Sequence, residues 1–251
     1  MKIVFRLGLI LLCGLALFSQ SVFARYNWPN GIYFGPGVVG VYTFFRVNGS
    51  TVGTPNPTLT KGKTSAGAAG FTSRLGYAFK KFPFQFDVSY KRIGDLSYDS
   101  SQVFSSISPT YNNVTSNLTA VTWFVNGYYN IHFSNKVLPY IGVGVGKTKN
   151  KTKLTATNSS GGTLKVDHTI SNVAYQGIVG VNFKVANNVL LYVAYHFVDL
   201  GKAQWGPWGS GSNRATLKSN NILVHEGEFG IKVFLGDQTP YQPPELISDT
   251  D

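Results

Sequence analysis

The sequence predicts an all-β protein: an eight-stranded antiparallel transmembrane β-barrel with up-and-down meander order, long outer loops and short periplasmic turns. Three observations predict it. The chain begins with an export signal, its composition is poor in charge, and about eight segments alternate apolar with polar residues. Of its 251 residues, 13% are charged and 14% aromatic, and 28 are Gly. A soluble domain usually carries about 25% charged residues, so this composition is unusual for a protein surrounded by water.

The first segment, MKIVFRLGLILLCGLALFSQSVFA, is typical of a signal peptide. Lys2 and Arg6 give a basic start, and residues 7–18 form an apolar run that is too short to span a bilayer as a helix. We expect cleavage after Ala24. Cleavage would remove Cys13, the only cysteine, and would thereby exclude disulfides and cysteine-based metal sites from the mature chain.

After this segment, no apolar run is long enough for a membrane helix, and the apolar residues are instead spread in alternation. Segments of about ten alternating residues separated by turns are the signature of a transmembrane β-barrel. Only the first of the eight segments leaves undecided which face meets lipid. The predicted strands cover residues 31–45, 67–79, 84–93, 118–133, 139–146, 169–184, 190–200 and 224–236.

The connectors alternate in length. Those after the second, fourth and sixth strands are tight (KKFP, FSNKV and KVANN), whereas the others have roughly 20 residues rich in Ser, Thr, Asn, Gly and Lys. Outer-membrane barrels have short periplasmic turns and long outer loops. A soluble lipocalin-like barrel is the alternative, but it would need polar outer faces. We therefore expect a signal peptide at residues 1–24, a barrel at 25–236 and a short periplasmic tail at 237–251.

In a membrane barrel the outer face meets lipid, so polar side chains are expected to point inward. The last predicted strand, VHEGEFGIKVFLG, would then place two carboxylates and a lysine in the lumen. An eight-stranded barrel is just wide enough for side chains to fill it, and unpaired buried charges would cost several kcal/mol each. We expect the lumen to hold a network of ion pairs made by Arg74, Asp87, Lys91, Lys184, His196, Glu226, Glu228 and Lys232.

Three stretches, WFVNGYYN from Trp123, PYIGVGVG from Pro139 and YHFVDLG from Tyr195, resemble the small outer-membrane β-barrel family that includes the opacity-type surface proteins and the OmpA transmembrane domain. The resemblance covers residues 26–236. It implies a monomer with both termini in the periplasm and surface roles such as adhesion or immune evasion. Two features depart from the family: His196 stands where relatives often have Arg, and a tail follows the final strand.

The motifs argue against an enzyme. His132-Phe133-Ser134 resembles the His-x-Ser element of lipid A deacylases, but Gly146 stands where the orienting carboxylate would be expected. The predicted turn that holds the motif also lies at the periplasmic side. No metal-ligand pattern, phosphate loop or dinucleotide fingerprint is present. We expect no catalytic residues, no cofactor and no metal, and we interpret the GVGVG repeat of the fifth strand as a packing feature.

The formal net charge is +11, and its densest cluster, KTKNKTK, begins the third outer loop. Nucleic acid is a poor partner for an exported barrel. Cations at the outer rim would instead face lipopolysaccharide phosphates, and an ordinary solvated hairpin is the alternative. The residues expected to contact this anionic surface are Arg92, Lys147, Lys149, Lys151 and Lys153.

The sequence thus predicts a non-enzymatic barrel in the outer membrane of a Gram-negative bacterium. Its outer loops would mediate adhesion to host surface molecules or other environmental contacts. The alternative function is an OmpW-like narrow channel for small hydrophobic molecules. A lumen plugged by paired charges favours the first function, and an apolar funnel favours the second.

Overall fold

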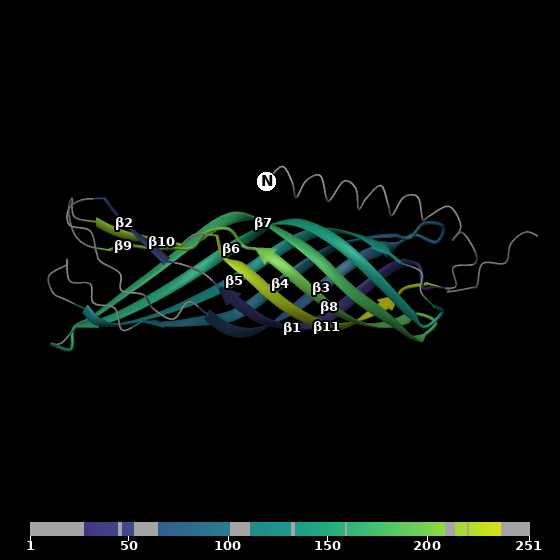
Figure 1. Cartoon of the computed structure of the whole chain (residues 1–251), viewed down its shortest axis with the longest axis horizontal. Helices are drawn as coiled ribbons and strands as arrows, with labels where there is room; N and C mark the ends of the chain where they lie inside the picture. Colours follow the sequence, from purple (N-terminus) through teal and green to yellow (C-terminus); the bar gives the residue numbers. More distant parts are fainter. Residues whose placement is uncertain are drawn as a thin grey trace, which may run out of the picture.

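The computed structural model describes residues 28–44, 47–52, 65–100, 111–131, 134–158, 160–208, 214–219 and 221–236. Within them, eight strands form a closed antiparallel barrel in the order β1-β11-β8-β7-β6-β5-β4-β3 (Figure 1). The barrel strands are β1 (Gly31–Phe44), β3 (Ser65–Ala78), β4 (Phe84–Ser100), β5 (Tyr111–Asn130), β6 (Val137–Asn158), β7 (Thr163–Ala186), β8 (Val189–Asp199) and β11 (Leu223–Phe234). The predicted fold class and meander order are confirmed.

The barrel closes where the first strand meets the last. β1 pairs with β11 from Tyr33 opposite Phe234 to Phe44 opposite Leu223. Every other barrel pair joins barrel strands that are neighbours in chain order, and the tight turns after β3, β5 and β7 form three of these seven pairs. Closure removes the free edges that would otherwise expose backbone polar groups to lipid.

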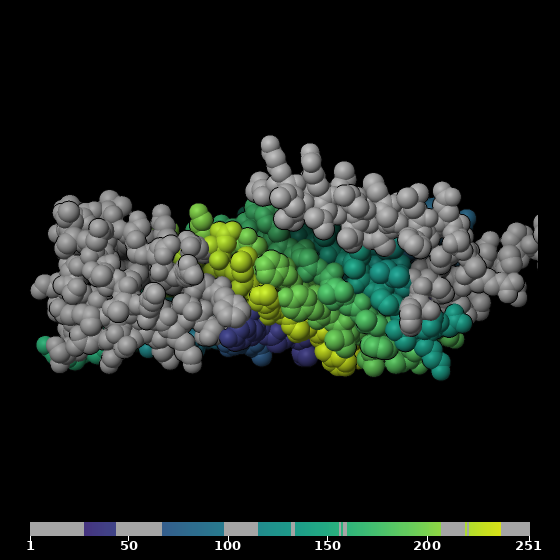
Figure 2. Space-filling model, in the orientation of Figure 1, coloured from purple at the N-terminus to yellow at the C-terminus, as the bar shows by residue number. Residues whose placement is uncertain are grey.

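The apolar side chains face outward, as predicted for a barrel whose outer face meets lipid. On β4, for example, Phe84, Phe86 and Val88 are exposed, while the residues between them are buried. β1, whose facing the sequence leaves undecided, follows the same rule: Ile32 and Phe34 face outward, and Tyr33 is fully buried. Figure 2 shows the side chains of β7, β8 and β11 forming one continuous outer wall.

The strands on the outer side are longer than the sequence predicts. β7 has 24 residues, more than twice the roughly 9–11 that cross a bilayer. The expected long loop between the fifth and sixth strands is a hairpin, because β6 runs to Asn158 and β7 begins at Thr163. β4 and β5 also extend past their predicted ends. Above the lipid-facing band, β4 to β7 therefore continue as a protruding sheet.

A second sheet lies at this outer end (Figure 1, left). It has the order β2-β10-β9 and is built from β2 (Val47–Val52), β9 (Gln204–Trp208) and β10 (Arg214–Ser219). No helix in the described part of the chain is long and apolar enough to cross a membrane. The expected signal peptide, the His132-Phe133 pair and the expected tail at 237–251 lie outside the described residues.

Candidate functional site

Inward-facing glycines make room for large side chains in the lumen. A Cβ atom added at Gly144 would lie 2.9 Å from Gln176 Nε2, and one added at Gly142 would lie 2.6 Å from Cδ1 of Tyr128. A Cβ atom at Gly35 would lie 3.1 Å from Cδ of Arg74. Tyrosine and amide side chains thus pack directly against the glycines of the GVGVG repeat. This agrees with the packing role inferred from the sequence.

A network of ion pairs crosses the middle of the lumen. Arg74 Nη2 pairs with Glu228 Oε1, and Arg74 Nη1 lies 3.6 Å from Asp87 Oδ2. Lys91 Nζ pairs with Glu226 Oε2 and lies 3.9 Å from Glu228 Oε2. All five side chains are almost completely buried. A buried charge is costly unless it is paired and hydrogen-bonded, so each member of this network depends on its partners.

Hydrogen bonds from neighbouring side chains add to the ion pairs of two of these carboxylates. The hydroxyl of Tyr33 donates to Asp87 at 3.0 Å, and the Asn126 amide donates to the other oxygen of Asp87 at 2.6 Å. The hydroxyl of Tyr192 donates to Glu228 at 2.7 Å. These partners come from three different strands, β1, β5 and β8, so the network ties separate parts of the barrel wall together.

The remaining residues of the predicted lumen set lie in different places. His196 is buried, with Nε2 3.1 Å from Glu228 Oε2 and Nδ1 3.1 Å from Gln176 Oε1. Lys184 lies on the inward row of β7 opposite Leu190, half-buried near the periplasmic end. None of the ion pairs described above includes Lys184 or Lys232. The structure therefore brings six of the eight predicted residues into one network.

Lys232 reaches the lumen without meeting a carboxylate. Its side chain is fully buried, and its Nζ has no hydrogen-bond partner among the described residues. Four tyrosine rings surround it instead, with centroids 4.8–5.6 Å from Nζ. The sequence predicted the burial of this lysine, but not its aromatic surroundings.

The outer half of the lumen is filled by an apolar cluster. Buried Ile93, Leu118 and Phe124 from the strands pack with Leu200 and Trp205 from the connection between β8 and β11. The sequence did not indicate this cluster, because these five members come from three segments far apart in the chain. No apolar run marks the connection as part of the core.

Polar side chains on the inner face of the protruding sheet hold this connection in place. The amide of Asn150 donates to the backbone oxygens of Leu200 at 3.0 Å and Lys202 at 3.1 Å. Thr152 donates to the Gln204 oxygen at 2.6 Å, and the Trp205 indole N–H donates to the Ser116 hydroxyl at 2.6 Å. Asn150 and Thr152 of KTKNKTK thus hold the connection between β8 and β11 inside the barrel.

The lysines of KTKNKTK occupy the opposite face of the same strand. Lys147, Lys149, Lys151 and Lys153 are all exposed on β6 and alternate with buried residues. Arg92 is exposed on β4, and Val121 of β5 lies between it and Lys149 in the register. The structure therefore places the five predicted cations on one outward face, just above the lipid-facing band. We call this set of five residues the basic face.

Carboxylates also stand near the basic face. Asp167 of β7 is the register partner of Lys153. Asp95 accepts a hydrogen bond from Thr119, the register partner of Lys151. None of the four lysines has a carboxylate within 4 Å among the described residues. The ammonium groups of this face are therefore directed at solvent.

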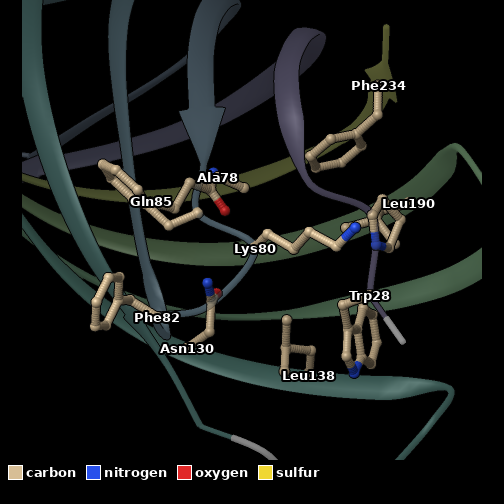
Figure 3. Close-up of a pocket in the computed structure, with 11 residues that line it drawn as sticks. Trp28, Ala78, Lys80, Phe82, Gln85, Asn130, Leu138, Leu190 and Phe234 are labelled. Carbon is tan, nitrogen blue, oxygen red and sulfur yellow. The ribbon is translucent and has the colours of Figure 1, made fainter. Parts of the chain in front are cut away.

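The periplasmic mouth holds a small recess. It is lined by Trp28, Gln85, Asn130, Leu138 and Phe234, among others (Figure 3). Trp28 packs with Leu138, Leu190 and Phe234 in one buried cluster. This cluster closes the barrel on the periplasmic side. In the described residues, no group of three or more His, Cys, Asp or Glu side chains is placed to hold a metal ion.

The structure is a closed eight-stranded barrel with a lipid-facing apolar wall and a charged lumen. A comparison of the chain with models of protein families agrees with it. The family model described as "Outer membrane protein beta-barrel domain" matches residues 10–227. This chain belongs to that family. The membership confirms the resemblance seen in the sequence, and it indicates location in the outer membrane of a Gram-negative bacterium.

Individual proteins with similarity to the chain are also outer-membrane or surface proteins. Outer membrane protein PagN of Salmonella typhimurium is 28% identical over 198 residues, covering 71% of this chain and 78% of PagN. The structure of Neisserial surface protein A covers 82% of this chain and 97% of its own, with 15% identity and a TM-score of 0.47. The outer membrane protein OprG of Pseudomonas aeruginosa covers 83% and 98%, with 14% identity and a TM-score of 0.49.

Proposed function

We propose that the protein is a non-enzymatic, monomeric surface barrel whose protruding sheet and outer loops make contacts at the cell surface, with a lumen that does not conduct. One observation carries the proposal: three successive layers of side chains fill the lumen. From the periplasm outward these are the Lys232 layer, the ion-pair network around Arg74 and Glu228, and the apolar cluster around Phe124 and Trp205.

The alternative function, a narrow channel for small hydrophobic molecules, would need an open apolar funnel. The apolar side chains of the outer half are instead packed on one another, and those of Ile93, Leu118 and Phe124 are each no more than 1% exposed. A solute would have to displace both this cluster and the ion pairs beneath it. This arrangement supports a contact surface rather than a conduit.

Planar-bilayer recording of the refolded protein tests this proposal. We expect no stable unitary conductance, because the carboxylates of the network are already paired and leave no continuous water path. Reproducible steps of uniform size from the wild-type barrel would contradict the sealed lumen and favour the channel. Recording from empty bilayers that received the same detergent is the control.

For the outer surface, we propose that the basic face contacts lipopolysaccharide. Four lysines repeat at every second residue of β6, so their spacing along the strand is about 6.7 Å. They continue the outward row of Val143 and Val145 on the same strand, and phosphates of the outer leaflet are the anions that such a row would meet first. Each cation near an anionic membrane surface contributes about 1 kcal/mol. Host surface molecules with the same anionic chemistry are further candidate partners.

Changing Lys147, Lys149, Lys151 and Lys153 together to Gln is expected to weaken lipopolysaccharide binding at least tenfold and to flatten its dependence on salt. Long-range attraction between exposed charges is screened within about 8 Å at physiological ionic strength. The measurement is binding to the refolded barrel across a salt series. A variant with Lys80, Lys81 and Lys136 of the periplasmic turns changed to Gln is the control. Equal affinity and equal salt dependence in both variants would make the basic face an ordinary solvated hairpin.

We also propose that the mature protein begins after Ala24 and carries the segment 237–251 as a short periplasmic tail. The basic start and short apolar run of the first 24 residues support this proposal. The intact mass of the protein purified from outer membranes tests it. A mass that retains the first 24 residues would contradict the cleavage.

A further inference from the structure

Lys232 is surrounded by aromatic faces from all round the barrel wall. The rings are Tyr33 of β1, Tyr128 of β5, Tyr140 of β6 and Tyr192 of β8, at 5.5, 5.6, 4.8 and 5.3 Å between Nζ and each ring centroid. A cation within about 6 Å of an aromatic centroid is attracted by the negative face of the ring. Four rings around one ammonium group form an aromatic cage, the arrangement proteins use to bind ammonium ligands.

The four rings of the cage are held by contacts that do not involve Lys232. Tyr33 and Tyr192 are fixed through their hydroxyls, which donate to Asp87 and Glu228. Tyr128 accepts a hydrogen bond from Arg74 at 3.2 Å. Tyr140 packs edge-on against Tyr128 with centroids 5.6 Å apart. The ring positions are therefore set by the ion-pair network and by packing, not by Lys232 itself.

Glycines on the lumen wall also shape the cage. A Cβ atom at Gly230 would lie 2.6 Å from Cζ of Tyr192, and one at Gly180 would come equally close to Tyr140. The tip of each ring therefore occupies the space above a glycine on the neighbouring strand, where any side chain would collide with it. Close packing of this kind leaves the rings few alternative positions.

Polar atoms without partners lie next to the cage. Among the described residues, the Asn130 Oδ1, both polar atoms of the Asn182 side chain and the Tyr140 hydroxyl are buried without hydrogen bonds. Asn130 is the register partner of Tyr140, and Asn182 is the register partner of Tyr192. Buried polar groups in proteins are nearly always satisfied by protein or ordered water. These atoms indicate a chamber that accepts water or a polar solute.

The chamber lies next to the cluster that closes the periplasmic end, since Tyr33 belongs to both. Gln85 and Asn130 line the periplasmic recess (Figure 3). Gln85 also donates a hydrogen bond to the hydroxyl of Tyr33, whose ring is one wall of the cage. One layer of side chains therefore separates the recess from the cage. On the outer side, the ion pairs of Arg74 and Lys91 and the apolar cluster block the way.

We propose that the four tyrosines form a cation site in the periplasmic half of the lumen that takes a primary alkylammonium ion, with Lys232 as its tethered occupant. In the wild-type chain the lysine fills the site. A chain that lacks the lysine presents an empty cage to small ammonium solutes from the periplasm. The site is separate from the outer surface. A failed test of the site therefore leaves the proposed contact function unaffected, and the reverse also holds.

Chemical rescue tests the site. Lys232→Ala removes four heavy atoms, and propylammonium supplies three carbons and one ammonium nitrogen in their place. We expect propylammonium to raise the urea midpoint of refolded Lys232→Ala saturably and to leave the wild-type midpoint unchanged. The neutral isostere 1-propanol should need a roughly tenfold higher concentration to raise the midpoint equally. It lacks the charge, so the cation–π attraction, which accounts for about a tenfold difference in affinity, is lost. If Lys232→Ala does not refold alone, each solute is added to the refolding mixture. The readout is then the fraction of protein that folds, measured as the fraction whose gel mobility changes on boiling.

Tyr140 supplies the matched controls, because its hydroxyl has no hydrogen-bond partner among the described residues. In the Lys232→Ala background, Tyr140→Phe keeps the ring and should preserve rescue, whereas Tyr140→Leu removes the ring and should abolish it. Equal effects of propylammonium and propanol would overturn the proposal, and so would absence of rescue or rescue that persists in Tyr140→Leu.

Discussion

Replacing Arg74 with alanine is expected to lower the free energy of unfolding by about 3–5 kcal/mol, the usual effect of removing one member of a buried ion pair. The guanidinium of Arg74 lies between Glu228 and Asp87, and all three side chains are buried. Without it, two carboxylates remain in the lumen with hydrogen bonds but without their neighbouring cation. Urea unfolding of the refolded barrel, followed by gel mobility or tryptophan fluorescence, measures the loss.

Glu228→Ala should have an effect of similar size, since it leaves Arg74 without its closest partner. The double variant should lose less than the sum of the two single losses, because the residues interact directly. Val179→Ile on the lipid-facing wall is the control, expected to change stability by less than about 0.5 kcal/mol. If Arg74→Ala and Glu228→Ala behave like this control, the charges do not stabilise the barrel and the assigned role of the lumen network is wrong.

The sequence predicted which residues enter the lumen because side chains on a strand alternate strictly between its two faces. Once lipid was assigned to the row of Phe84, Phe86 and Val88, the intervening Asp87 had to point inward. The same reasoning placed Glu226 and Glu228 correctly. β1 was ambiguous because both of its rows are apolar or glycine, as in Phe34, Gly35 and Val39.

The pairing of these residues could not be read from the sequence. Arg74 of β3 reaches Glu228 of β11 by passing over Gly35 of the intervening β1, and Lys91 of β4 reaches across the lumen to Glu226. Which side chains share a level depends on the stagger of all eight strands, a property of the closed barrel. Lys232 lies at a level where the other strands contribute tyrosines and no carboxylate.

The protruding sheet was missed for a different reason. Above the bilayer a strand no longer needs an apolar outer row, so the alternation of Lys147, Thr148, Lys149 and Asn150 looks like a polar loop. The signal was nevertheless present, since the cations occur at every second position. The partners of the intervening Thr and Asn are backbone oxygens of a distant connection, which no local pattern announces.

Gly146→Ala is expected to destabilise the barrel by about 3 kcal/mol, the upper part of the range for overpacked cores. A Cβ atom at this position would collide with the backbone oxygen of Trp123 and would lie 2.9 Å from its carbonyl carbon and 2.7 Å from Cδ1 of Phe124. The two obstructing atoms of Trp123 belong to the backbone of the paired strand β5, which cannot move without breaking the ladder between β5 and β6. The readouts are the urea midpoint and the folded fraction after refolding.

Gly177→Ala is the matched control, because it adds the same methyl group at a strand glycine that faces outward with nothing within 4 Å of the new atom. It should be neutral or stabilising by up to about 1 kcal/mol, since alanine restricts the unfolded chain more than glycine does. Opposite outcomes at the two positions would show that the glycines of the GVGVG repeat are selected by space in the lumen. A loss of similar size at both positions would instead mean that strand flexibility, not packing against Phe124 and Trp123, requires glycine here.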